Sequence, residues 1–365
     1  MSNQGSLMRF IRKTHYNQDI QLFKHNGQRF WYGLLAVIVL AAPLWLDRFY
    51  LGELSLVFIY AIAGIGLMLL VGYTGLVSLG HAAFLAIGAY THAYLLTSGW
   101  PFLTAIIGAA SLTAFVGAIV AIPAMRMTGI YLAIATLAFA VIVEQVLTHW
   151  QSVTGGYRGL LVPDANLFGL DLTTPVVFYF LCLLVLIVGL LIALNLLRSP
   201  SGRAMVAVRD SEVSAQSMGI HVAATKRMAF AISAGFTGVA GALFSHKIGY
   251  LSPDAFTLLT SIQLLLMVVV GGLGSMHGVI YGAIFIGLLP QAIALLRDGL
   301  PPVIAQIPGV EPGIFGLILV LFLIYEPLGI YGRWQKIRLY FEEFPLYRRA
   351  TYKRQKSYLR TERLR

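Results

Sequence analysis

Long apolar runs separated by short polar connections constrain this chain more than any other feature of its sequence. One helical crossing of a bilayer needs about 20 apolar residues, and runs of this length recur between residues 30 and 331. Soluble domains carry about 25% charged residues, whereas this 365-residue chain is 11% charged and 58% hydrophobic. We predict an all-α, polytopic membrane protein with about ten crossings. They are placed at 30–46, 53–72, 78–97, 101–125, 128–150, 175–197, 228–247, 258–277, 280–297 and 313–331.

The charged residues gather at both ends and in one internal loop. Segments 1–29, 198–227 and 333–365 hold 27 of the 41 charged residues. Cytoplasmic loops of membrane proteins are enriched in Lys and Arg. With the N-terminus inside, 22 basic residues fall on the cytoplasmic side and four on the other. This asymmetry predicts that both the N- and C-termini are cytoplasmic.

Three segments follow from this distribution. A cytoplasmic N-terminal segment covers 1–29, a transmembrane domain with a cytoplasmic loop at 198–227 covers 30–331, and a basic and aromatic cytoplasmic tail covers 332–365. Mixed aromatic and basic residues are typical of lipid headgroup regions, so we expect the tail to contact anionic lipid or, alternatively, a partner subunit. We expect no nucleic-acid partner, because such binders carry basic residues on a wet face beside recognition elements.

The sequence lacks the usual signatures of chemistry. No Gly-Lys dipeptide occurs, so a phosphate-binding G-x-x-x-x-G-K-[ST] loop is excluded. The single cysteine, Cys182, excludes an intrachain disulfide and a cysteine-based zinc site. The histidines form no H-x-x-x-H pair and have no acidic cluster beside them. We therefore expect no catalytic residues, no metal site and no cofactor.

Glycines cluster in two regions, each of which runs from the end of one predicted crossing into the next. Six fall between 64 and 88 and six between 271 and 287, and both clusters contain Gly-Leu-x-Ser followed by a histidine. Small residues allow membrane helices to pack closely, and glycines also permit a broken or re-entrant helix that lines a path. A polar solute would need hydroxyl and aromatic groups along that path. Our candidates for lining it are Tyr73, Thr74, Ser78 and His81.

The internal loop predicts a short helix on the cytoplasmic side. Pro200 and Gly202 end the preceding helix, and Gly219 suits the left-handed residue that follows a helix end. Between them we expect one amphipathic helix with an apolar stripe at Ala204, Val208, Ala215 and Met218. Such a helix is either a connector on the membrane surface or a docking element for a soluble subunit.

Four stretches together resemble the permease subunits of branched-chain amino acid ABC importers, a LivM-like group that also includes urea-type permeases. They are LLVGYTGLVSLGHAAFLAIGAY at 69–90, TGIYLAIATLAFAVIVEQV at 128–146, the loop at 198–227 with GFTGVAGAL at 235–243, and LLLMVVVGGLGSMHGVIYGA at 264–283. The likeness is collinear from about residue 55 to residue 329. The polar start and the basic tail lie outside it.

The resemblance implies a docking role for the loop. Permeases of ABC importers carry a coupling helix with an E-A-A-x-x-x-G pattern that sits in a cleft of the ATPase. Aligned by Gly219, this chain keeps Ala215 but has Val213 and Ser214 in place of the first two letters. The expected ATPase-coupling residues are Arg203, Arg209, Asp210, Glu212, Ala215 and Gly219.

The resemblance also implies the function and the partners. The chain would be a multi-pass permease of a bacterial inner membrane, without enzyme activity, for branched-chain amino acids or a related small polar solute. It would assemble with a second homologous permease, two cytoplasmic ATP-binding subunits and a periplasmic solute-binding protein. Two alternatives remain: a self-sufficient secondary carrier or facilitator, and a membrane-embedded transferase.

Overall fold

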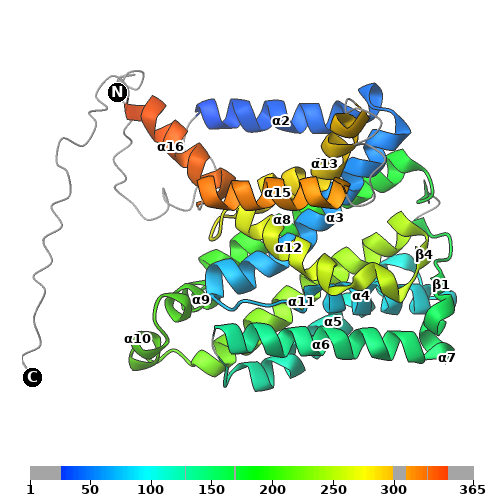
Figure 1. Ribbon diagram of the computed structural model, residues 1–365, viewed down its shortest axis with the longest axis horizontal. Coiled ribbons are helices and arrows are strands. Elements are labelled where there is room, and N and C mark those ends of the chain that lie inside the picture. The colour runs from blue at the N-terminus through cyan, green and yellow to red at the C-terminus, as the bar shows by residue number, and fades with distance from the viewer. Residues whose placement is uncertain (1–25, 128, 168–169, 299–309, 327, 344–365) are drawn as a thin grey trace, which may run out of the picture.

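The computed structural model describes residues 26–343 except 128, 168–169, 299–309 and 327. The expected N-terminal segment up to residue 25 and the tail from residue 344 lie outside the described residues. The described chain is mainly helical, with long helices that run roughly alongside one another (Figure 1). The longer helices are α2 (Asn26–Trp45), α3 (Arg48–Leu67), α4 (His81–Thr97), α5 (Phe102–Ala124), α6 (Ile130–His149), α8 (Pro175–Arg198), α11 (Val222–Ile248), α12 (Leu258–Gly271), α13 (Met276–Asp298), α15 (Val310–Tyr325) and α16 (Gly329–Glu343).

Short elements fill the connections. The helical ones are the π-helix η1 (Met68–Gly72), α7 (Gln151–Thr154), η2 (Gly156–Arg158), α9 (Pro200–Asp210), α10 (Glu212–Ser217) and η3 (Pro253–Phe256). The strands are β1 (Leu160–Leu161), β2 (Asn166–Leu167), β3 (Leu170–Asp171) and β4 (Tyr250–Leu251). β1 pairs antiparallel with β4, so that Leu160 lies opposite Leu251, and β2 pairs antiparallel with β3.

The expected all-α membrane protein is confirmed, but the number of ten crossings is not. Each predicted crossing contains a helix, yet seven described helices are long and apolar enough to span a bilayer. The number becomes eight if Pro312–Tyr325 and Gly329–Tyr340 form one span with a 44° bend. α4 and the apolar part of α2, Arg29–Trp45, are shorter than the roughly 20 residues that a crossing needs.

The core is built around α3 and α11. In the most apolar window of each span, 78% of the residues are buried for α3 with η1 and 67% for α11, against 28% for both α5 and α6. Small residues allow the central contacts. A Cβ added at Gly88 of α4 would lie 2.3 Å from the carbonyl oxygen of Gly238 in α11. The close-packing interpretation of glycine therefore holds here.

The connections between the helices gather at two opposite ends of the molecule. At one end β1 pairs with β4, and Lys247 Nζ lies 2.7 Å from where a Cβ at Gly52 would be. At the other end α9 contacts the break after η1, and Gly329 packs on Gly272. In Figure 1 the end that carries α9 and α10 is on the left, and β1, β4 and α7 are on the right.

Candidate functional site

The first glycine cluster contains a break in the helix, at 73–80 between η1 and α4. The last carbonyl groups of a helix lack partners within it, and here each finds one. Thr74 Oγ1 donates to the carbonyl of Leu69 at 2.8 Å, and the amide groups of Leu76 and Gly75 donate to the carbonyls of Leu70 and Val71. Gly75 has a φ of 76°, which glycine adopts at little cost. The break is therefore an ordered turn that is held by hydrogen bonds.

The second glycine cluster contains a shorter break at 272–275, between α12 and α13. Gly272 and Gly274 have φ values of 115° and 82°. The expected crossing at 258–277 ends earlier in the structure, at Gly271, because the two glycines turn the chain before the next helix. The two breaks touch, since a Cβ added at Gly72 would lie 2.9 Å from the amide nitrogen of Gly274.

Arg209 of α9 joins both breaks to the internal loop. Its Nη1 donates to the carbonyl of Gly72 at 2.9 Å, which completes the capping of η1. Its aliphatic side chain packs over Gly75, where an added Cβ would lie 3.0 Å from Arg209 Cγ. Its guanidinium lies near Gly274, where an added Cβ would lie 3.5 Å from Nη1. The guanidinium also bonds to Asp210 Oδ1 at 2.9 Å and 3.1 Å. A cation at a helix C-terminus is favoured by the helix dipole.

The polar residues predicted to line a path lie in and beside the first break. Thr74, Ser78 and His81 are buried, and Tyr73 is half-buried. The His81 ring bonds through Nδ1 to Ser78 Oγ at 3.0 Å and through Nε2 to Ser233 Oγ of α11 at 2.8 Å. The structure therefore joins Ser78 and His81 directly, whereas Thr74 bonds back to the Leu69 carbonyl and Tyr73 packs against the hydrophobic core.

Two further helices supply hydroxyl groups to this segment. Thr136 Oγ1 of α6 accepts from the Leu79 amide at 2.9 Å, and Ser261 Oγ of α12 accepts from the Ala82 amide at 2.9 Å. Sequence reasoning assigned no role to Ser233 or Ser261. Nothing in the linear order of the sequence places either residue opposite residues 78–82, which lie more than 150 positions away.

The loop after α8 forms two helices, so the expected single helix is wrong. Ser199 Oγ accepts from the Gly202 amide at 3.3 Å and begins α9. The predicted stop after Arg198 is confirmed, but Gly202 lies inside α9 and not in a turn. Ser211 has an extended backbone, and its Oγ accepts from the Ser214 amide at 3.3 Å. Serine is a preferred residue at this capping position, so α10 begins anew there.

The end of α10 has the predicted geometry. Gly219 has a φ of 82°, its amide donates to the Gln216 carbonyl, and the Ile220 amide donates to the Ala215 carbonyl. This is a Schellman cap, which needs glycine or asparagine in the left-handed position. The predicted apolar stripe is correct for the buried Val208 and Ala215 but wrong for Met218, which is 82% exposed because α10 has its own direction. Val213, 80% exposed, lies on the same short helix.

Glu212 and Lys226 form an ion pair that sequence reasoning missed. Lys226 Nζ of α11 lies 2.7 Å from Glu212 Oε1, and the Lys226 side chain is 2% exposed against 43% for Glu212. The pair fastens α10 to the beginning of α11. The sequence offered one signal for this pair, because Lys226 is a basic residue within the first turns of a largely apolar helix.

The remaining predicted coupling residues face solvent. Arg203 is exposed and donates through Nη1 to the Arg198 carbonyl at 2.8 Å. Asp210 is 64% exposed and pairs with Arg209. The predicted coupling residues therefore fall into two groups. Arg203 and Asp210 face solvent, whereas Arg209 and Glu212 contact other parts of the protein.

Two histidines that are distant in the sequence meet near the opposite end. His92 Nε2 of α4 lies 2.9 Å from His246 Nε2 of α11, and the ring of Phe102 packs edge-on against His92. Among the described residues, no group of three or more His, Cys, Asp or Glu side chains is arranged to hold a metal.

Comparison with known proteins gives a family match over most of the chain. Residues 49–324 match the family described as "Branched-chain amino acid transport system / permease component". The "High-affinity branched-chain amino acid transport system permease protein LivM" of Escherichia coli K12 is 36% identical over 324 residues, which covers 81% of this chain and 74% of the relative.

Two other relatives carry similar names. "Probable branched-chain amino acid transport permease protein LivM" of Methanocaldococcus jannaschii is 28% identical over 62% of this chain and 67% of its own. The "High-affinity branched-chain amino acid transport system permease protein BraD" of Pseudomonas aeruginosa PAO1 is 25% identical over 75% of this chain and 92% of its own. No solved structure matches the chain.

Proposed function

The chain belongs to the branched-chain amino acid permease family of ABC transporters, and on this premise we propose that it is the membrane subunit of an ATP-driven importer. Members of this family are membrane components and not enzymes. We assign it branched-chain amino acids or a related small polar solute, because the similar proteins carry that name. Its partners are two ATP-binding subunits, a second homologous permease and a periplasmic solute-binding protein. It is located in a bacterial inner membrane.

The proposed organisation is a permease domain at 30–331 between two cytoplasmic segments, with the end that carries α9 and α10 facing the cytoplasm. The positions of the basic residues support this orientation. Arg126, the loop at 198–227 and the basic part of α16 are at or next to the connections on that end. The boundary at 331 falls inside α16, which begins at Gly329.

The observation that carries the proposal is the bridge from Arg209 to both glycine breaks. Val213 of α10 and Met218, the residue that caps its end, are 80% and 82% exposed, and neither belongs to a helix long enough to span the membrane. We assign this surface to the ATP-binding subunit. Coupling requires contacts that differ between two states of the partner. A displacement of α9 and α10 would pull Arg209 on Gly72 and thereby move both breaks.

The solute path follows the segment at 73–81 in this proposal. Its polar groups, from Tyr73 to His81, lie where α6, α11 and α12 converge, and the adjoining turn is the part that Arg209 contacts. The path opens when the breaks rearrange. Ser78→Cys tests this, since the buried thiol should react with a small charged thiol reagent during ATP-driven cycling and resist it at rest. Equal reactivity in both conditions would contradict the assignment.

The central experiment is reconstitution of the chain with its partner subunits in proteoliposomes. Arg209→Ala should retain the ATP-binding subunits and their hydrolysis but lower solute uptake per ATP by about tenfold, which corresponds to about 1.4 kcal/mol of coupling. Met218→Asp should instead lose the ATP-binding subunits, because it places a charge in the proposed contact.

Arg158→Ala is the matched control, because Arg158 is an exposed arginine in η2, at the opposite end of the molecule and outside the coupling loop. It should behave as the wild type. Normal uptake per ATP in Arg209→Ala would refute the bridge. Uptake by the chain without any ATP-binding subunit would refute the importer itself.

A further inference from the structure

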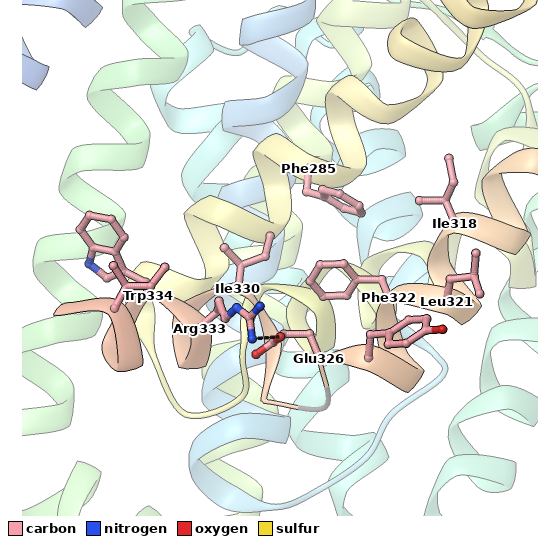
Figure 2. A pocket seen from close by; sticks show the side chains of 10 residues that line it. Phe285, Ile318, Leu321, Phe322, Glu326, Ile330, Arg333 and Trp334 are labelled. Atoms are coloured by element: carbon pink, nitrogen blue, oxygen red, sulfur yellow. Dashed lines mark ion pairs between the residues drawn. The ribbon is translucent and has the colours of Figure 1, made fainter. Parts of the chain in front are cut away.

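An apolar groove lies where α15 bends into α16. It has a volume of about 630 Å³, within the range of about 300–1,000 Å³ that is typical of ligand pockets. Phe285 of α13 and Ile318, Leu321 and Phe322 of α15 form its apolar wall, and Ile330 of α16 closes it (Figure 2). None of these residues belongs to the coupling loop or to the proposed path.

Glu326 and Arg333 are among the residues that line this groove, and Lys336 lies beside Glu326, next to the groove. Arg333 Nη1 is 3.3 Å from Glu326 Oε2, and Lys336 Nζ is 3.9 Å from Glu326 Oε1. Figure 2 shows the Arg333 and Glu326 pair between the apolar wall and Trp334. Glu326 is 14% exposed, whereas the side chains of Arg333 and Lys336 are 64% and 59% exposed. Two cations against one carboxylate leave an excess positive charge on the solvent side.

The groove lies at the boundary between apolar and polar helix. α15 is apolar from Gly313 to Tyr325, and α16, after a 44° bend, carries Arg333, Lys336 and Arg338. Trp334, 52% exposed, is at the rim. Tryptophan is enriched at the level of lipid headgroups, and Lys and Arg reach to it from helix ends.

We propose that this groove binds an anionic phospholipid, with an acyl chain against Phe285, Ile318 and Phe322 and the phosphate on Arg333 and Lys336. The match of charge decides the class of lipid, because a zwitterionic headgroup gains less from an excess cation. The occupant is a membrane lipid rather than free phosphate, because the apolar wall would contribute nothing to phosphate binding. The inference rests on the membrane embedding of the proposed permease and not on its transport activity.

Trp334 provides a direct reporter. The full chain is placed in phosphatidylcholine nanodiscs that contain a rising fraction of brominated phosphatidylglycerol, and a parallel series contains brominated phosphatidylcholine. The Trp334 signal is the difference between the wild type and Trp334→Phe. Half of this signal should be quenched at a fraction of brominated phosphatidylglycerol that is about fivefold lower than the corresponding fraction of brominated phosphatidylcholine. This factor corresponds to about 1 kcal/mol for the one net cation. Glycerol phosphate in solution should leave the quenching unchanged.

Three variants make the result specific. Arg333→Gln with Lys336→Gln should bring the two series together, and Glu326→Gln should separate them further because it removes the compensating charge. Arg227→Gln is the control, since Arg227 is an exposed cation on α11 near the same end of the molecule, and it should keep the wild-type separation.

Two outcomes would overturn the proposal. Coincident series in the wild type would mean that the groove takes any lipid. Absence of quenching by either lipid would mean that lipid does not reach the groove. Protein would then cover it, as a partner subunit seated there would do. Solute uptake is measured separately, so a failure of lipid selectivity leaves the importer assignment intact.

Discussion

Lys226 places an ammonium group in the interior of the protein, where it forms an ion pair with the carboxylate of Glu212. Its side chain is 2% exposed and its Nζ lies 2.7 Å from Glu212 Oε1. Removal of one partner of such a pair leaves a buried charge without compensation, which costs more than the pair contributes. Because Glu212 is itself 43% exposed, water limits the damage.

Glu212→Gln should therefore lower the stability by about 1–3 kcal/mol, the usual cost of a buried group that loses a charged partner. Thermal unfolding of the chain in detergent measures the loss. Glu212→Gln combined with Lys226→Met should recover at least half of it, because the buried charge is then gone. If the single variant unfolds like the wild type, Lys226 has another source of solvation.

Residue roles were partly predictable from the sequence. Gly219 was predicted correctly because a left-handed position after a helix is a local requirement that glycine meets. Arg209 was identified as a charged member of the loop, but its contact with Gly72 spans 137 residues of sequence. The partners of His81 were not predictable for the same reason, since Ser233 lies 152 residues away.

The helical elements depend on backbone contacts that only glycine allows. α12 and α13 cross so closely that a Cβ at Gly282 would lie 2.0 Å from the Met267 carbonyl oxygen. By contrast, Gly316 in α15 has no atom within 4 Å of an added Cβ. The two positions form a matched pair within neighbouring apolar helices.

Gly282→Ala should lower the yield of folded protein and reduce stability by about 1–3 kcal/mol, because overpacking forces the two helices apart. Gly316→Ala should be neutral or slightly stabilising, since alanine is the better helix former. Yield and thermal unfolding in detergent decide the matter. Equal effects of the two substitutions would mean that the α12 and α13 crossing has room to adjust.

At this scale the sequence predicted where helices occur better than where they end. Each apolar run contains a helix, because a segment in the bilayer must satisfy its backbone polar groups internally. The break at Ser211 was missed because one capping serine decided it, and the orientation of Met218 was lost with it. The last expected crossing, 313–331, is interrupted after Tyr325, because the proline that follows Glu326 in the sequence disfavours helical geometry at Glu326.

The whole molecule has two ends that differ in basic residues. Alternating helices bring Arg126, the loop at 198–227 and α16 to one end, and Arg48, Arg158 and Lys247 to the other. The excess of basic residues marks the cytoplasmic side. The distribution of basic residues thus predicts an orientation in the membrane. The packing of the helices is compatible with this orientation but does not determine it.

Single introduced cysteines would test the orientation, because the native Cys182 is fully buried and its thiol should not react with a polar reagent. Met218→Cys lies on α10 and Tyr157→Cys in η2, and the native side chains are 82% and 78% exposed. In spheroplasts a membrane-impermeant maleimide should label Tyr157→Cys and leave Met218→Cys unlabelled. After lysis of cells that lack the ATP-binding subunits, which would otherwise cover position 218, both should react, whereas the native chain should react in neither case. The reverse pattern would place α9 and α10 outside the cell, where no ATP-binding subunit could reach them, and would refute the importer assignment together with the orientation.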